Sequence, residues 1–280
     1  MQLIIVTGMS GSGKSVVLRL LEDSGFYCVD NLPATLIPEL VDNLHNSQAR
    51  IAISVDTRSE ALEMLPSYLD NMRQRGITVQ LIFLESNVQS LVKRFSETRR
   101  RHPLSKGNMT LAESIENERN MLAPLASLGH HIDTSELSPN TLRQWVRDLV
   151  AHDHQGMSLL FTSFGFKHGV PLDADFVFDV RCLPNPHWDA KLRPLTGKDP
   201  AVQDFLAKQT LVSEMYQDIQ TFVERWLAHF VKENRHYLTV AVGCTGGQHR
   251  SVYLVEKLAA HFQSAHQQVL IRHRELEIKL

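Results

Sequence analysis

Eight consecutive residues near the N-terminus constrain the fold of this chain more than any other feature. They are Gly8, Met9, Ser10, Gly11, Ser12, Gly13, Lys14 and Ser15. Their pattern, G-x-x-x-x-G-K-[ST], is that of a phosphate-binding P-loop, which has a strand before it and a helix after it. The apolar run Leu3 to Val6 precedes the motif, and an amphipathic segment from Lys14 to Ser24 follows it. The chain therefore begins with a strand, a P-loop and a helix.

The chemistry of phosphate binding accounts for the residue types in this motif. Glycines let backbone N–H groups wrap the phosphates, Lys14 reaches the β and γ oxygens, and the Ser15 hydroxyl coordinates Mg²⁺ at a helix N-terminus. The motif predicts a nucleoside triphosphate as ligand. Asp56 ends the apolar run Ile51 to Val55, where a carboxylate can hold the metal through water. An ordinary loop aspartate is the alternative.

Short β-branched runs alternate with helical periodicity from Met1 to about His152. The strand-like runs are Leu3 to Val6, Phe26 to Val29, Ile51 to Val55 and Val79 to Leu84, and the helical ones include Val16 to Leu21, Val88 to Phe95 and Thr141 to Val150. This alternation is typical of βαβ units around a parallel sheet. Residues 1–152 are therefore predicted to form a P-loop domain of the small-kinase type.

Three further features of this domain suit a kinase-like site. Asp30 ends a strand where small kinases keep a carboxylate that orients the acceptor, although an Asx turn is equally compatible. Arg94 and the run Arg99 to His102 can form a cationic lid over the phosphates, or an ordinary solvated basic surface. Residues 132–135 end a fifth strand, where such folds present backbone to the base.

The periodicity breaks between Ala151 and Gly156, which sets the predicted domain boundary. Residues 153–280 again read as α/β. The expected strands are Leu159 to Phe164, Phe176 to Val180, Tyr237 to Val242 and Gln268 to Ile271, with helices from Val202 to Val231 and from Ser251 to Phe262.

A second strand, Gly-rich loop and helix surrounds residues 243–251. The helix N-terminus, the amides of Gly246 and Gly247 and the side chains of His249 and Arg250 can converge on one anion. Cys244 and Arg250 also stand at the separation used by cysteine phosphatases. However, Gly243 occupies the place where those enzymes usually carry histidine, so a small buried residue is the simpler interpretation of Cys244.

Composition limits the possible compartments and partners. The 29 Lys and Arg nearly balance 31 Asp and Glu, so any nucleic-acid binding needs a local cationic patch. Three cysteines without metal-ligand spacing speak against a disulfide framework or a zinc site. No run approaches a membrane span, and Leu3 to Val6 is too short for a signal peptide. A cytoplasmic protein without membrane contact is expected.

Several blocks of sequence together resemble the RapZ/YvcJ family over nearly the whole chain. They are the P-loop, Phe26 to Pro33, Thr98 to Leu104, Phe164 to Gly169, Leu183 to Asp189 and Gly243 to Ser251. The resemblance implies bacterial cytosolic proteins that bind ATP and GTP. In enterobacterial members it implies an RNase adapter that binds a small regulatory RNA, presents it to RNase E and senses glucosamine-6-phosphate, thereby controlling amino-sugar synthesis. A homo-oligomer is expected.

The resemblance also implies where the sites lie. The ATP loop falls on Gly8 to Ser15 and a GTP segment on Asp56, Thr57, Arg58 and Ser59. The sugar-phosphate site falls on His187, Thr245, Gly246, Gly247, His249, Arg250 and Ser251. The RNA-binding tail falls on His266, Arg272, His273, Arg274 and Lys279. Glu275 and Glu277 oppose these cations, so a terminal strand with a polar end is the alternative for the tail.

The leading interpretation is a two-domain regulatory adapter in which nucleotide turnover is secondary, at most a weak ATP or GTP hydrolase. The first alternative is a small-molecule kinase that uses Lys14, Ser15, Asp56, the arginine lid and Asp30. A cysteine-dependent phosphatase centred on Cys244 is the second alternative.

Overall fold

The computed structural model of the chain describes residues 1–45, 47–59, 61–105, 109–151, 157–233, 235, 237–264 and 268–276. The chain divides into two compact units, Met1–Ala151 and His152–Leu280. Each unit has its own parallel sheet and its own hydrophobic core. The predicted fold class, a P-loop kinase-like domain followed by a second α/β domain, is confirmed.

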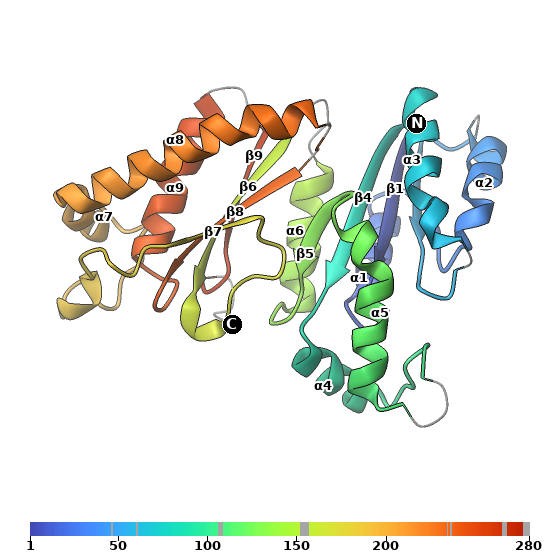
Figure 1. The fold of residues 1–280 in the computed structure, drawn as a ribbon, viewed down its shortest axis with the longest axis horizontal. Helices are drawn as coiled ribbons and strands as arrows, with labels where there is room; N and C mark the ends of the chain where they lie inside the picture. Colours follow the sequence, from blue (N-terminus) through green and yellow to red (C-terminus); the bar gives the residue numbers. More distant parts are fainter. Residues whose placement is uncertain are drawn as a thin grey trace. The chain divides into compact units, whose positions relative to one another are not determined.

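The N-terminal unit is built on five parallel strands in the order β2-β3-β1-β4-β5 (Figure 1). The strands are β1 (Gln2–Gly8), β2 (Tyr27–Val29), β3 (Arg50–Ser54), β4 (Thr78–Glu85) and β5 (His130–Asp133). β1 lies in the middle, with Val6 level with Ser54 of β3 and Gly8 level with Leu84 of β4. The carboxyl ends of these strands therefore deliver the P-loop, the segment after β3 and Glu85 to one edge of the sheet, where ligands of such folds bind.

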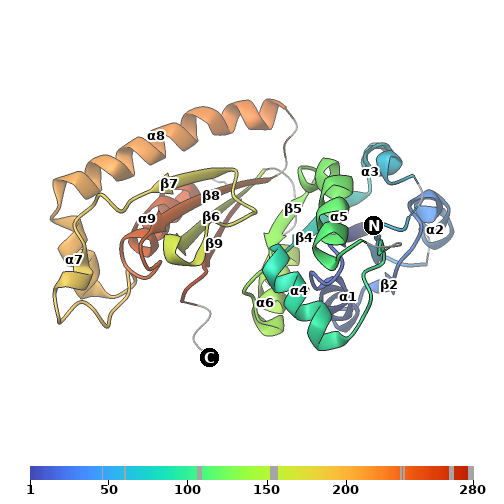
Figure 2. The same ribbon diagram turned by 60° about the horizontal axis from the view of Figure 1, so that its bottom comes forward.

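Among the described residues of this unit, six α-helices accompany the sheet. They are α1 (Lys14–Asp23), α2 (Ile37–Leu44), α3 (Leu65–Gln74), α4 (Val88–Thr98), α5 (Leu111–Ala126) and α6 (Pro139–Val150). Alternate residues of the strands, among them Ile5, Ile53 and Phe83, share a core with α2, α3 and α5. The helices α1 and α6 contact each other, and Figure 2 shows them away from α3 and α5, across the sheet. Both faces of the sheet are thus covered, as a parallel sheet requires.

The C-terminal unit has four parallel strands in the order β7-β8-β6-β9. They are β6 (Ser158–Gly165), β7 (Phe176–Asp179), β8 (Tyr237–Cys244) and β9 (Gln268–His273). The helices are α7 (Pro200–Ala207), α8 (Thr210–Lys232) and α9 (Arg250–Ser264). Phe161 of β6 and Val242 of β8 share one core with residues of all three helices.

The helical region expected from Val202 to Val231 is two helices rather than one. α7 ends at Ala207 and α8 begins at Thr210, with Gln209 in an extended conformation between them. No glycine or proline marks this break, so periodicity alone does not reveal it. Within the described part of the chain, no helix is both long and apolar enough to cross a membrane.

Candidate functional site

The P-loop joins β1, which ends at Gly8, to α1, which begins at Lys14. Gly8 has a φ of 127°, and a Cβ there would lie 2.0 Å from the backbone oxygen of Leu84 on β4. The same oxygen accepts a hydrogen bond from the Met9 N–H at 2.9 Å. Only glycine fits this approach of loop to sheet. The first glycine of the motif is therefore required by backbone packing.

Lys14 is held inside the loop by backbone carbonyls. Its Nζ donates hydrogen bonds of 2.7 and 3.0 Å to the carbonyls of Gly8 and Met9. Burial lowers the pKa of Lys14, while the negative charges of Glu118 and Asp56, and more weakly of Asp30, act to raise it. A lysine at this place in a P-loop supplies positive charge to the phosphates of a nucleotide that carries its own divalent metal.

A cavity of about 640 Å³ opens beside the P-loop. It is bordered by the loop, by the end of α4 with the residues after it, and by the segment that leads into α6. Arg100 and Arg101 of the predicted lid line it, as does Thr134 of the segment predicted to face the base. The cavity is large enough for a nucleoside, since ligand pockets start near 300 Å³.

Two cations assigned to the lid have structural partners instead. The Arg94 guanidinium donates hydrogen bonds to the Gly11 carbonyl and the Thr134 hydroxyl, both at 3.1 Å, and so ties the P-loop to the end of β5. His102 is buried, and its Nε2 lies 3.0 Å from a carboxylate oxygen of Glu118. The expectation that His102 is an exposed lid cation is therefore wrong, because the ring turns inward to a buried acceptor.

The predicted GTP segment, residues 56–59, borders the P-loop site. Asp56 is nearly buried and accepts hydrogen bonds from the Arg58 backbone at 3.0 Å and its Nε at 2.9 Å. The Thr57 hydroxyl donates to Glu118 at 2.8 Å, and the Ser59 hydroxyl accepts from the Ala34 N–H at 2.6 Å. Because Glu118 also contacts Ser10, this segment and the P-loop are joined through one side chain.

The residues assigned to Mg²⁺ suit that ion. The Ser15 hydroxyl lines the cavity at the start of α1, and the Asp56 charge is felt by Lys14 of the same turn. A hydroxyl and a carboxylate are oxygen ligands of the kind that Mg²⁺ prefers, with nucleotide phosphates and waters completing its shell. Among the described residues, no cluster of three His, Cys, Asp or Glu side chains could hold a metal by itself.

Glu118 of α5 is the functional residue that the sequence analysis missed. It is fully buried and contacts Ser10 of the P-loop, Thr57 and His102. A signal was present in the sequence: Glu118 stands in register with the buried apolar positions Ile115, Leu122 and Leu125 of the same helix. A carboxylate on the apolar stripe of a helix requires polar partners in the folded protein.

The second Gly-rich loop, between β8 and α9, packs against the end of β6. Gly247 has a φ of 70°, and a Cβ there would lie 2.2 Å from a carboxylate oxygen of Glu275. The other oxygen of Glu275 accepts the Gly165 N–H at 2.9 Å. A Cβ at Gly165 would lie 2.8 Å from the backbone of Gly246. This loop is therefore enclosed by backbone and by a carboxylate.

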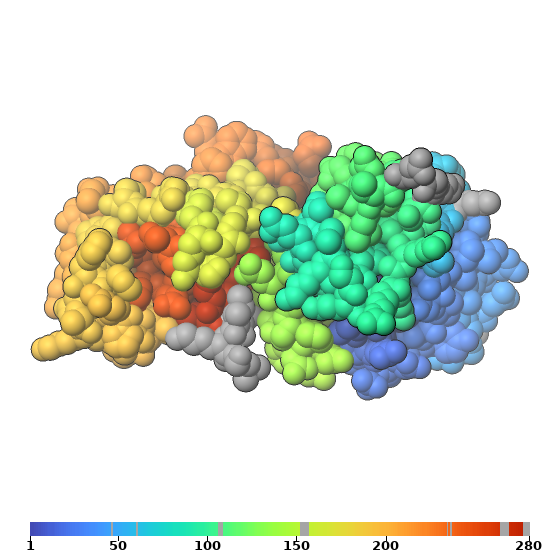
Figure 3. Space-filling model, turned by 90° about the horizontal axis from the view of Figure 1, so that it is seen from below, coloured from blue at the N-terminus to red at the C-terminus, as the bar shows by residue number. Residues whose placement is uncertain are grey.

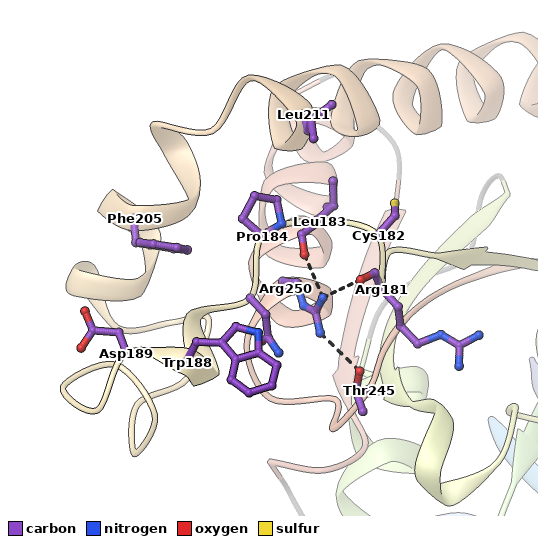
Figure 4. Close-up of a pocket in the computed structure, with 11 residues that line it drawn as sticks. Arg181, Cys182, Leu183, Pro184, Trp188, Asp189, Phe205, Leu211, Thr245 and Arg250 are labelled. Atoms are coloured by element: carbon purple, nitrogen blue, oxygen red, sulfur yellow. Dashed lines mark hydrogen bonds between the residues drawn. The ribbon is translucent and has the colours of Figure 1, made fainter.

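Arg250 holds two segments of the C-terminal unit together (Figure 4). Its Nη1 donates to the carbonyls of Arg181 at 2.8 Å and Leu183 at 2.9 Å, and its Nη2 lies 3.3 Å from the Thr245 hydroxyl. With Thr245, Asn185, Trp188 and others it lines a cavity of about 900 Å³. Figure 3 shows orange-red surface of the C-terminal unit between yellow and gold segments of the same unit.

The other side chains assigned to the sugar phosphate differ in exposure, and none of the three is among the residues that line this cavity. His187 is exposed, with its ring centroid 6.4 Å from that of His249. Burial lowers the pKa of His249, and its Nε2 lies 3.3 Å from the Leu192 carbonyl, so the ring is a neutral donor to backbone. Ser251 is fully buried, with its hydroxyl 3.2 Å from the Cys244 sulfur. In this structure the His249 ring bonds to backbone and the Ser251 hydroxyl to Cys244, so the convergence of His249 with Arg250 on one anion stays a prediction.

Cys244 belongs to the hydrophobic core of its unit. It is 3 % exposed, in agreement with the interpretation of a small buried residue. A thiolate that attacks phosphorus would have to leave this core, which disfavours the phosphatase alternative.

The described residues of the predicted RNA-binding tail are buried. Arg272 and His273 lie in β9, Arg274 follows it, and each is less than a tenth exposed. His273 places its Nδ1 2.8 Å from the Ser163 hydroxyl and its Nε2 2.9 Å from Glu256. The side chains that were expected to contact RNA are thus buried where β9 pairs with β6. His266 and Lys279 lie outside the described residues.

Comparison with known sequences finds a matching family model for each of the two units. Residues 1–154 match the family model described as the RapZ-like N-terminal domain, and residues 157–277 match the RapZ C-terminal domain. A nucleotide-binding protein of Methylobacillus flagellatus is 61% identical over 278 residues, which are 99% of each chain. A nucleotide-binding protein of Chromobacterium violaceum is 59% identical over 278 residues, again 99% of each chain.

Solved structures resemble part of the chain. Shikimate kinase from Bacteroides thetaiotaomicron has a TM-score of 0.39 and 17% identity, and the match covers 54% of this chain and 98% of that one. Shikimate kinase from Acinetobacter baumannii in complex with shikimate has a TM-score of 0.39 and 18% identity over 53% of this chain and 92% of that one. Because the two family models together cover both units, the chain belongs to the RapZ family.

Proposed function

We propose that this chain is a nucleotide-binding regulatory adapter whose C-terminal unit senses a phosphorylated sugar. The observation that carries nucleotide binding is the P-loop, with Lys14 held by the carbonyls of Gly8 and Met9 beside a cavity of about 640 Å³. The relatives named nucleotide-binding proteins support the same proposal. ATP and GTP are the proposed ligands. Mg²⁺ bound by the Ser15 hydroxyl and, through water, by Asp56 would neutralise phosphate charge.

Calorimetry with Lys14→Ala tests nucleotide binding. Lys14 supplies charge to phosphate and its described bonds go only to loop carbonyls, so we expect affinity for ATP and GTP to disappear while the fold persists. Lys93→Ala is the matched control, since Lys93 is an exposed lysine of α4 in the same unit. Unchanged affinity of Lys14→Ala would overturn the assignment of the P-loop as the nucleotide site.

The proposed ligand of the C-terminal unit is glucosamine-6-phosphate, bound at Thr245, Arg250 and His187. The support is the cavity of about 900 Å³ that Thr245 and Arg250 line together with Trp188. Trp188 is 80% exposed and offers an apolar face against which a sugar ring can pack.

A substitution that spares the loop architecture tests this site best. Arg250 holds the carbonyls of Arg181 and Leu183, so its removal can disturb the loops as well as the ligand. Thr245→Val keeps the volume and removes only the hydroxyl. We expect it to reduce thermal stabilisation by glucosamine-6-phosphate while leaving nucleotide binding intact. Full stabilisation in both Thr245→Val and His187→Ala would place the sugar phosphate elsewhere.

An adapter role with a small regulatory RNA and RNase E is the further part of this proposal, and it rests on the family. Because Arg272 and Arg274 are buried, the proposed RNA contact uses exposed cations of the C-terminal unit such as Lys167 and Lys191. In gel shifts, Lys167→Glu combined with Lys191→Glu should weaken RNA binding and flatten its salt dependence. Unchanged affinity and slope would exclude this surface.

Light scattering of the native chain tests the proposed homo-oligomer.

A small-molecule kinase is the second candidate function, and one observation favours it. Asp30 is exposed at the end of β2, and its charge reaches Lys14, which suits a carboxylate that orients an acceptor. A screen of metabolites for phosphoryl transfer separates the two functions. An acceptor whose phosphorylation is lost in Asp30→Asn, with nucleotide affinity retained, would favour the kinase over the adapter.

A further inference from the structure

Glu118 links three segments of the N-terminal unit that lie far apart in the sequence. One carboxylate oxygen accepts hydrogen bonds from the Ser10 hydroxyl at 2.7 Å and the Thr57 hydroxyl at 2.8 Å. The other accepts the Ser10 backbone N–H at 2.8 Å and lies 3.0 Å from Nε2 of His102. The P-loop, the segment after β3 and the end of the arginine run therefore meet on one side chain.

The hydrogen bonds assign the protonation of this cluster. Nδ1 of His102 accepts the Leu104 N–H at 3.2 Å, so the proton of a neutral ring is on Nε2 and is donated to Glu118. All four partners of Glu118 are then donors, two to each oxygen. A carboxylate with both oxygens doubly hydrogen-bonded is an acceptor only, which is the ionised form. A negative charge is therefore buried at the P-loop.

This charge is bonded directly to the P-loop, at the backbone N–H and the hydroxyl of Ser10. P-loop amides wrap phosphates and the lysine reaches the β and γ oxygens. Here the Ser10 amide is already occupied by Glu118, and Glu118 is the carboxylate with the strongest influence on Lys14. A γ-phosphate brought to Lys14 meets the Glu118 charge at short range, whereas a diphosphate ends one phosphate earlier.

We propose that Glu118 is the residue through which this site distinguishes a nucleoside triphosphate from a diphosphate. Repulsion between the γ-phosphate and the carboxylate opposes triphosphate binding, and the bound triphosphate displaces Glu118 from Ser10. Thr57 and His102 then lose their shared acceptor, and the Arg99 to Arg101 run that precedes His102 is released to follow the phosphates. The inference rests on the proposed nucleotide binding and adds to it a switch between nucleotide states.

The test compares Glu118→Gln with Glu116→Gln by calorimetry, with ATP and ADP in the presence of Mg²⁺. Both variants remove one negative charge from α5, but Glu116 is exposed and pairs with Arg119. We expect Glu118→Gln to raise the affinity for ATP relative to ADP by about tenfold or more, the size of a unit charge felt at a few ångströms in a protein site. Glu116→Gln should leave that ratio unchanged.

A carboxamide places an N–H₂ where Glu118 accepts hydrogen bonds, so the melting temperature of each variant is measured first and Glu118→Ala is included. If Glu118→Gln unfolds, Glu118→Ala takes its place, since it removes the charge without adding a donor. The same relative gain for ATP and ADP in the variant that folds would overturn the inference while leaving nucleotide binding intact. A native chain that binds neither nucleotide would overturn the proposed function and this inference together.

The release step has a separate readout in the imidazole signals of His102. They can be assigned in nuclear magnetic resonance spectra by comparison with His102→Asn. In the native chain we expect ATP to shift them, because the acceptor leaves Nε2, and ADP to leave them in place. Identical spectra with the two nucleotides would show that Glu118 keeps its partners and would overturn the release step.

Discussion

The two Gly-rich loops of this molecule have the same local plan and different surroundings. Each follows a central parallel strand, precedes a helix and lies against a buried glutamate, Glu118 in one unit and Glu275 in the other. In the first loop the cation, Lys14, is bonded only to carbonyls of its own loop. In the second, Arg250 is bonded to the distant carbonyls of Arg181 and Leu183. Similar motifs thus give one cation partners within its own loop and give the other partners that tie the loop to a distant segment.

The largest effect is expected from the first glycine of the P-loop. Gly8→Ala places a Cβ 2.0 Å from the backbone of β4 at a φ of 127°. We therefore expect the free energy of unfolding to fall by about 3 kcal/mol or more, and nucleotide binding to be lost as well. Gly247→Ala should cost less, because the nearest atoms to its Cβ belong to the movable side chain of Glu275, and the backbone N of Gly165 lies at 2.7 Å rather than 2.0 Å. Denaturant unfolding measures both. Gly25→Ala, with positive φ but open space around it, is the control.

Removal of the two cations, Lys14 and Arg250, should change the free energy of unfolding by different amounts. Arg250→Ala leaves the carbonyls of Arg181 and Leu183 without their donor, which should destabilise the C-terminal unit by about 2 to 3 kcal/mol. Lys14→Ala leaves only two carbonyls of its own loop without a donor, at a half-buried position, so its loss of unfolding free energy should be smaller than that of Arg250→Ala. Chemical denaturation of both variants checks this. Equal destabilisation would mean that the two loops use their cations alike.

Cys244→Ala tests the enclosed character of the second loop. Because the sulfur packs in the core beside Ser251, we expect a loss of about 1 kcal/mol from the removed packing, with the affinity for glucosamine-6-phosphate unchanged. Thermal shift assays with and without the sugar phosphate measure both quantities. Release of phosphate by the native chain that disappears in this variant would restore the phosphatase alternative.

The smallest expected effect is a pH dependence of stability that arises from His249 in the second loop. Burial lowers the pKa of His249 in the folded state, so the unfolded chain binds more protons as pH falls below the usual value of 6.5. The free energy of unfolding is therefore not reduced by His249 above about pH 6.5, and it declines as pH falls from there toward the lowered pKa. His273, whose pKa burial also lowers, adds to the same trend. Unfolding at pH 7.5 and 5.5 should show a weaker pH dependence in His249→Gln than in the native chain.

Local signals predicted more of the fold than of the sites. β1, α1 and the P-loop follow from an apolar run, a motif and a helical period that are contiguous in the sequence. Neither the break between α7 and α8 nor the burial of the β9 side chains has such a local signal. Arg272 and His273 read as exposed tail cations because their burial depends on the pairing of β9 with β6, a strand more than a hundred residues earlier.

The sequence by itself determined the two α/β units, the position of the P-loop, the boundary region and the family resemblance, because each depends on residues close together in the chain. Only the tertiary structure decided which polar side chains face a ligand. Glu118 meets Ser10 across 108 residues and Arg250 meets Arg181 across 69, and nothing local to either residue names its partner. A buried charge or donor must be satisfied, and the folded chain rather than the motif chooses the group that satisfies it.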